Sequence, residues 1–275
     1  MTFCVLENQN RISKKEIVKF LKRLGIEVKT STKARGHQGF FLKNRIDVSN
    51  RLTDERAAEV LVHEFAHYIN EKIEGNIAKT GGSLEVLFPD LDTKTVEKEL
   101  LKVTEFVDKN SRLLTLKKMK EDISSKIKKF QEEIKLEYPD FKRSEEYKPF
   151  KKYFRHSNAK YLLKYDRVKI VSPFLRRVSI LSVRDVEQDF TELPPAIINY
   201  IKLRSYQRKQ SRVQRRICKL KAYYKRPSEL FARFVESLFI DKTKTVDLAP
   251  FSSGIFFKNL ENGYYYELKD LFMLF

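Results

Sequence analysis

The chain contains little of what defines several classes of protein. Its two cysteines, Cys4 and Cys218, are too few and too far apart for a disulfide framework or a cysteine-ligated zinc site, so we expect reduced thiols. Glycine and proline number only eight each in 275 residues, which disfavours a β-sandwich or a disordered chain. No stretch approaches the roughly 20 apolar residues of a membrane span, and no secretory signal opens the sequence. We therefore expect a cytoplasmic protein without a membrane partner.

Core-forming residues, in contrast, are plentiful. Hydrophobic residues make up 41% of the chain and include 21 Phe and 13 Tyr, enough for one sizeable core with an insertion or for two modest domains. Apolar side chains recur mostly at three- and four-residue spacing, which is the helical period. The expected fold class is therefore α+β and mainly helical.

Local patterns predict individual elements. A short helix should begin at Ser13 and end near Gly25. Brief strands are predicted at 26–29, 39–42 and 45–48, and an exposed edge of such a sheet could pair with an extended peptide or be purely structural. The stretch 93–136 indicates one or two long amphipathic helices, the second case with a break near Asn110-Ser111, and its shifting register favours an antiparallel helical hairpin over a coiled coil. Further predictions are a loop over 139–153, strands around 169–171 and 178–181, and a helix over 196–224.

Basic residues are concentrated in one segment. The formal net charge is +19, and residues 151–226 alone carry +16. Such a field attracts polyanions, nucleic acid first. The alternative is a solvated helix whose cations pair with acids such as Glu97, Glu99, Glu132 and Glu133. The candidate phosphate contacts lie on the predicted helix 196–224: Arg204, Arg208, Lys209, Arg212, Arg215, Arg216 and Lys219.

Two of the four histidines bracket a glutamate in the run His63-Glu64-Phe65-Ala66-His67. On a helix, positions i and i+4 are one turn plus about 40° apart, so both imidazoles can reach one metal ion. Thr53 is the expected N-cap and Gly75 the expected stop of that helix. Glu64 lies about 100° round from His63, where it could act as general base on a water and then as general acid. The alternative without a metal site is a surface helix that carries two histidines by chance.

Two stretches together resemble a family. The run from Ile46-Asp47-Val48 through Arg56 to the histidine motif is similar to the strand and active helix of zincin-like metallopeptidases of the ImmA/IrrE and ArdC-related type, found on phages and mobile elements. The downstream stretch 226–236, Arg-Pro-Ser-Glu-Leu-Phe-Ala-Arg-Phe-Val-Glu, resembles their Glu-x-x-Ala-Arg-x-Phe helix. The resemblance implies a zinc peptidase core at 1–78 and 216–275, interrupted by a helical, basic insertion at 79–215.

The remaining question is the third zinc ligand, for which Glu229, Glu236 and His156 are candidates. Glu236 is roughly 10 Å beyond Glu229 by helical rise, so only one of them can reach the metal. His156 lies in a polar stretch without a regular pattern. The resemblance selects Glu229.

The expected function is therefore hydrolysis of peptide bonds in a protein substrate by one Zn²⁺ held by His63, His67 and Glu229, with Glu64 catalytic. The oxyanion donor is open among four residues: Tyr68, Tyr223, Tyr224 and Arg233. The rival is a nucleic-acid-binding protein of a mobile element whose zincin core is structural or inactive.

Overall fold

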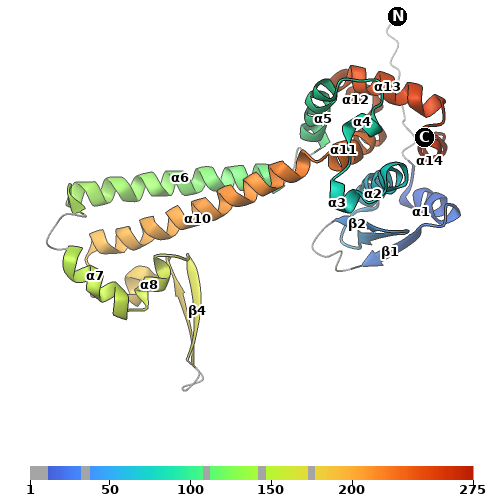
Figure 1. Cartoon of the computed structure of the whole chain (residues 1–275). Coiled ribbons are helices and arrows are strands. Elements are labelled where there is room, and N and C mark those ends of the chain that lie inside the picture. Colours follow the sequence, from blue (N-terminus) through green and yellow to red (C-terminus); the bar gives the residue numbers. More distant parts are fainter. Residues whose placement is uncertain (1–11, 32–37, 108–111, 142–146, 173–176, 275) are drawn as a thin grey trace, which may run out of the picture. The chain divides into compact units, whose positions relative to one another are not determined.

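The computed structural model describes residues 12–31, 38–107, 112–141, 147–172 and 177–274. The chain divides into two compact units, one made of 1–109 with 222–275 and the other of 110–221 (Figure 1). The first unit is discontinuous in sequence, as expected, but it includes residues 79–109, which the sequence placed in the insertion. The reason is packing, because helix α5 (Thr93–Val107) contacts helix α11 (Pro227–Ile240) of the same unit.

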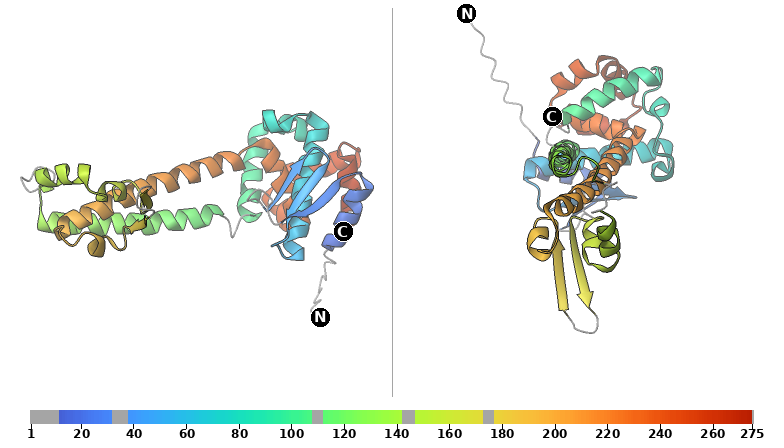
Figure 2. Two further views of the ribbon diagram at one scale, coloured as in Figure 1. Left: turned by 90° about the horizontal axis from the view of Figure 1, so that it is seen from below. Right: turned by 90° about the vertical axis from the view of Figure 1, so that its left-hand side faces the viewer.

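A small sheet and helix α1 (Lys14–Arg23) form one side of the first unit (Figure 2). Strand β3 (Arg45–Ser49) is central, with β1 (Glu27–Ser31) parallel on one side and β2 (Gly39–Leu42) antiparallel on the other. The turn between β2 and β3 contains Lys43 at a positive φ of 54°. Ile46 and Val48 of β3 point into the core, since alternate residues of a strand face opposite sides.

Two helices fill the centre of this unit. Helix α2 (Asp54–Glu74) is capped by the Thr53 side chain and ends at Gly75, as the sequence predicts, and packs against α11. Around them lie the remaining helices α3 (Ile77–Thr80), α4 (Leu84–Leu87), α12 (Lys242–Leu248), α13 (Pro250–Glu261) and α14 (Tyr266–Phe272). Fully buried aromatic rings join these helices: Phe65, Phe88, Phe231, Phe234, Phe256 and Tyr265. Burial of each such ring stabilises the fold by about 1.5–3 kcal/mol.

Two long helices dominate the second unit. Helix α6 (Arg112–Glu137) lies antiparallel along α10 (Pro195–Tyr224), whose last turn belongs to the first unit. The Phe130 ring stacks on Tyr206 at 5.8 Å, and the Gln210 amide donates to the Ser124 hydroxyl at 2.7 Å. The smaller elements are α7 (Tyr147–His156), α8 (Ala159–Leu162), β4 (Arg167–Ser172), β5 (Arg177–Ser182) and α9 (Val186–Asp189).

The described residues confirm a mainly helical chain with a small sheet, and they correct two local predictions. The predicted hairpin within 93–136 is wrong, because α5 packs on α11 and α13 whereas α6 packs along α10. The predicted break at Asn110-Ser111 lies outside the described residues, as does Cys4. The predicted loop over 139–153 is wrong from Tyr147 onward, where Phe150 and Phe154 pack on the second core. Within the described parts of the chain, no helix is both long and apolar enough to cross a membrane.

Candidate metal centre

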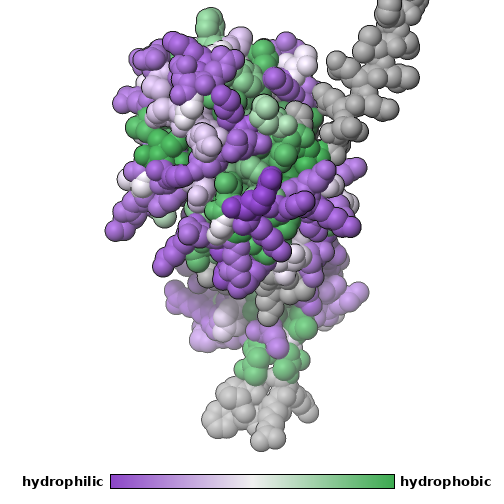
Figure 3. All heavy atoms as spheres, turned by 90° about the vertical axis from the view of Figure 1, so that its right-hand side faces the viewer, coloured by the Kyte–Doolittle hydropathy of each residue, from purple (hydrophilic) through white to green (hydrophobic). Residues whose placement is uncertain are grey.

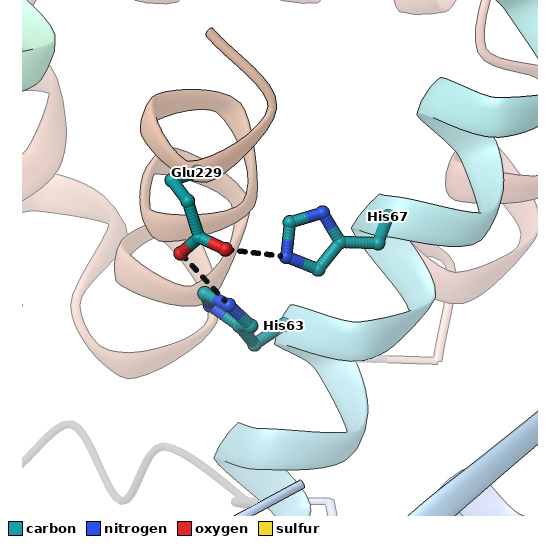
Figure 4. Close-up of side chains that lie close together, drawn as sticks. All are labelled: His63, His67 and Glu229. Carbon is teal, nitrogen blue, oxygen red and sulfur yellow. Dashed lines mark ion pairs between the residues drawn. The ribbon is translucent and has the colours of Figure 1, made fainter. Parts of the chain in front are cut away.

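Helices α2 and α11 bring three metal-ligating side chains together (Figure 4). His63 and His67 project from successive turns of α2 toward the Glu229 carboxylate on α11. The Nε2 atom of His67 is 3.2 Å from Glu229 Oε1, and Nε2 of His63 is 3.7 Å from Oε2. The candidate ligand atoms of the three residues all lie within 4.8 Å of one another. The group could therefore hold a metal ion.

A backbone contact fixes where Glu229 enters the site. Pro227 occupies the first turn of α11, where its missing N–H costs nothing. The next N–H, that of Ser228, donates to the Gly81 carbonyl at 3.0 Å. The neighbouring Gly82 has a φ of 83°, and a Cβ there would lie 3.1 Å from the Ser228 nitrogen. The contacts with Gly81 and Gly82 thus fix the position of the first turn of α11, and this turn carries Glu229.

Glu229 has the surroundings of a metal ligand. Its side chain is buried, and Oε2 has no hydrogen-bond partner among the described residues. Burial alone raises a carboxyl pKa, but the hydrogen bond and charge of His67 lower that of Glu229 to about 2. One ligand atom from each of the three residues lies within 4.8 Å of the others, and two imidazole nitrogens with a carboxylate oxygen are a donor set that zinc takes. The three side chains could therefore hold a metal ion, and their donor types suit zinc.

Glu64 lies beside this group without belonging to it. The side chain is buried, and burial raises the pKa of its carboxyl group, although the charges of His63 and His67 oppose the rise. It faces the start of the edge strand β2, because a Cβ on Gly39 would come within 3.1 Å of Glu64 Oε1. A carboxylate with a raised pKa at such a place suits proton transfer.

Glu236 has a role that the sequence analysis missed. As expected from helical rise, Glu236 is not part of the three-residue group, but its Oε2 accepts from His63 Nδ1 at 2.9 Å. Its Oε1 accepts from Arg56 at 2.8 Å, and Arg233 lies 3.7 Å away. Despite complete burial, the hydrogen bond and charge of His63 hold the Glu236 pKa well below its ordinary value. Glu236 thus orients the His63 ring so that Nε2 faces Glu229.

The seven-residue spacing of Glu229 and Glu236 was the available signal for this arrangement. It indicated that both carboxylates share one face of a helix. It did not indicate that a single imidazole could bridge them through its two nitrogens, which point in different directions.

The remaining candidate ligand, His156, and the candidate oxyanion donors have different surroundings. His156 is exposed at the end of α7 in the second unit and is not part of the metal-binding group. The Tyr68 ring packs on Phe41 and Phe65, and Tyr224 lies under the Arg233 guanidinium. Tyr223 differs: the residue is 38% exposed overall, but local desolvation of the hydroxyl, then the charge and hydrogen bond of Glu229 and the charge of Glu64, raise its pKa. The Tyr223 hydroxyl therefore interacts electrostatically with the carboxylates of both Glu229 and Glu64.

The basic residues of α10 have mixed surroundings. Lys209 and Arg212 both contact Asp166, at 2.5 and 3.4 Å, while Arg204 donates to Gln207. The other four candidates are exposed: Arg208, Arg215, Arg216 and Lys219.

Three of the acids that the sequence suggested as partners for these cations have other contacts. Glu133 pairs with Lys129 of its own helix at 3.7 Å, and Glu97 pairs with Lys225 at 3.6 Å. Glu99 is buried in the first unit, where it accepts from the Ser252 backbone N–H at 2.8 Å. The acid that Lys209 and Arg212 contact, Asp166, was not among the acids suggested by the sequence.

No protein-family model, curated protein or solved structure matches this chain. Functional inference rests on the site itself.

Proposed function

We propose that the chain is a zinc-dependent metallopeptidase that hydrolyses peptide bonds in a protein substrate. The observation that carries the proposal is the convergence of His63, His67 and the buried Glu229 carboxylate, whose two oxygens face the two imidazoles, with Glu64 adjacent. These are the donor types of a catalytic zinc site with an open position. The proposal includes the zincin-like core and the cytoplasmic location expected from the sequence.

The chain's own residues have distinct tasks in this proposal. Glu64, whose pKa burial raises, accepts the proton of the attacking water and later passes it to the leaving amine. The Tyr223 hydroxyl, in the field of Glu64 and Glu229, donates to the oxygen of the scissile carbonyl as negative charge develops there. Glu236 keeps the His63 ring in one orientation. A zinc ion, when bound, lowers the pKa of a water and polarises the carbonyl.

The substrate would bind along strand β2. It is an edge strand of the three-stranded sheet, so its outer N–H and C=O groups can pair with an extended peptide. Gly39 allows the strand to approach α2 closely at Val60 and Glu64. A peptide paired with this edge would run beside the catalytic carboxylate.

Glu64→Gln tests the proposal, with Glu55→Gln as control because Glu55 is exposed on the same helix. Zinc content of purified protein and cleavage of an unstructured protein such as casein are measured together. We expect Glu64→Gln to keep one zinc per chain and to lose cleavage at least 100-fold, while Glu55→Gln changes neither. Cleavage that survives Glu64→Gln, or an absence of zinc from the unsubstituted protein, would refute the proposed function.

The rival function, nucleic-acid binding with a structural zincin core, is favoured by the +16 charge of residues 151–226. It predicts binding that Glu64→Gln leaves intact.

A further inference from the structure

The β4–β5 hairpin exposes apolar side chains to solvent. Lys169 pairs with Ile180, and Val171 pairs with Val178 in its antiparallel register. Val171, Val178 and Ile180 are each more than half exposed. The hairpin extends away from the helices of the second unit, and Figure 3 shows apolar side chains gathered along it. Because an isolated two-stranded sheet is marginally stable by itself, a partner that covers this face would stabilise the hairpin.

Strand geometry places cations on that same face. Residues directly opposite in an antiparallel pair point to the same side, and every second residue along a strand does so too. Arg167, Lys169 and Val171 therefore share one face with Val178 and Ile180, and both cationic residues are exposed. The face combines aliphatic groups with positive charge, and residues 167–182 contain four basic residues and no acid.

Helix α10 presents exposed cations such as Arg208, Arg215, Arg216 and Lys219, but other cations of this helix are already in ion pairs. Lys202 pairs with Glu187 at 2.6 Å, and Lys209 and Arg212 pair with Asp166. One side of α10 also packs on α6 through Val213 and Ile217. The acids that follow the hairpin, from Asp185 to Glu192, come after its base at Ser182. Within residues 167–182 themselves, no acid offsets the positive charge.

We propose that the β4–β5 hairpin is a DNA-binding arm that enters a groove of the duplex. The major groove of B-DNA admits a two-stranded β-ribbon. Arg167 and Lys169 would contact phosphates, and the aliphatic row would contact base edges and sugars. The major groove of duplex RNA is too deep and narrow for such a ribbon, so the arm favours DNA. This site is independent of the metal centre.

Full-length protein with a fluorescently labelled DNA duplex tests the arm by anisotropy over a salt series. The double variant Arg167→Ala/Lys169→Ala is compared with Arg215→Ala/Arg216→Ala, which removes the same charge from an exposed part of α10. We expect the hairpin variant to bind about tenfold more weakly and to lower the log–log salt slope by about 1.8, or about 0.9 for each phosphate that the arm no longer neutralises. The α10 variant should change affinity less than about threefold.

A second variant separates apolar contact from charge. Val178→Ser/Ile180→Ser keeps every charge, so affinity should fall while the salt slope stays the same. Circular dichroism of each variant verifies the fold, and Glu64→Gln should bind DNA normally. Three results would overturn the proposal: no DNA binding, equal losses in both charge variants, or equal affinity for duplex RNA. Loss of self-association without loss of DNA binding would also overturn it, since it assigns the face to a second copy of the chain.

Discussion

Glu236→Gln should weaken zinc binding although Glu236 is not a ligand. The carboxylate offers one oxygen to His63 Nδ1 at 2.9 Å and the other to Arg56 at 2.8 Å. An amide has a single acceptor oxygen, so one of these two bonds must be lost. Loss of the partner of a metal-ligating histidine typically costs 10- to 100-fold in metal affinity, or about 1.4–2.7 kcal/mol. We expect about tenfold for Glu236→Gln and close to 100-fold for Glu236→Ala.

Competition with a chromophoric zinc chelator measures these affinities. Glu59→Gln is the matched control. Glu59 also accepts from Arg56, at 2.6 Å, and its substitution removes the same charge, but the His63 ring donates to Glu236. Glu229→Ala should lose zinc on dialysis, and His156→Ala should bind as the unsubstituted protein does. Equal losses in Glu59→Gln and Glu236→Gln would refute the reasoning, since they would trace the effect to Arg56 and not to the imidazole.

Two further predictions concern stability. Gly39→Ala should destabilise the first unit by about 1–3 kcal/mol in urea unfolding, because its Cβ would lie 2.3 Å from Val60 Cγ1. Gly254→Ala, which meets nothing within 4 Å on α13, is the control and should be neutral or stabilising, and an unchanged midpoint in Gly39→Ala would contradict the close approach. The Asp166 pKa is raised by partial burial, but the hydrogen bond and charge of Lys209 and the charge of Arg212 hold it below its usual range. The ion pair therefore stabilises the second unit fully above about pH 4, and this stabilisation falls progressively as pH drops through the lowered pKa. Asp166→Asn should therefore reduce the urea midpoint near pH 7, and reduce it less near pH 3.

Sequence predicted best where local chemistry decides the structure. Thr53 and Gly75 delimit α2 because capping and a positive φ act within a few residues. Strands β4 and β5 and helix α10 lie close to their predicted ranges for the same reason, since β-branched runs and helical spacing are local signals. The convergence of His63, His67 and Glu229 had two sources. Helical spacing united the histidines, and the resemblance alone supplied the glutamate.

Sequence predicted worst where partner choice decides the structure. The apolar spacings of α5 and α6 indicated helical structure over this stretch and left one or two helices open. They could not reveal the partners of those helices, because an amphipathic stripe does not specify which other stripe it meets. Helix α7 was missed because its lysines mask a short apolar face, formed by Phe150 and Phe154. The task of Glu236 depends on the position of His63 on a helix more than 170 residues earlier in the chain, which no local pattern encodes.

The discontinuity of the first unit affects how the protein is made. About 160 residues separate His67 from Glu229, and the whole second unit lies between them. At roughly 5–20 residues per second, the ribosome delivers Glu229 about 8–30 s after His67. During that interval the face of α2 that will pack on α11 is without its partner, and the nascent chain offers a metal only two imidazoles. The three-residue group can therefore form only after the inserted unit has been synthesised, although α1, β2 and β3 can pack on α2 before then.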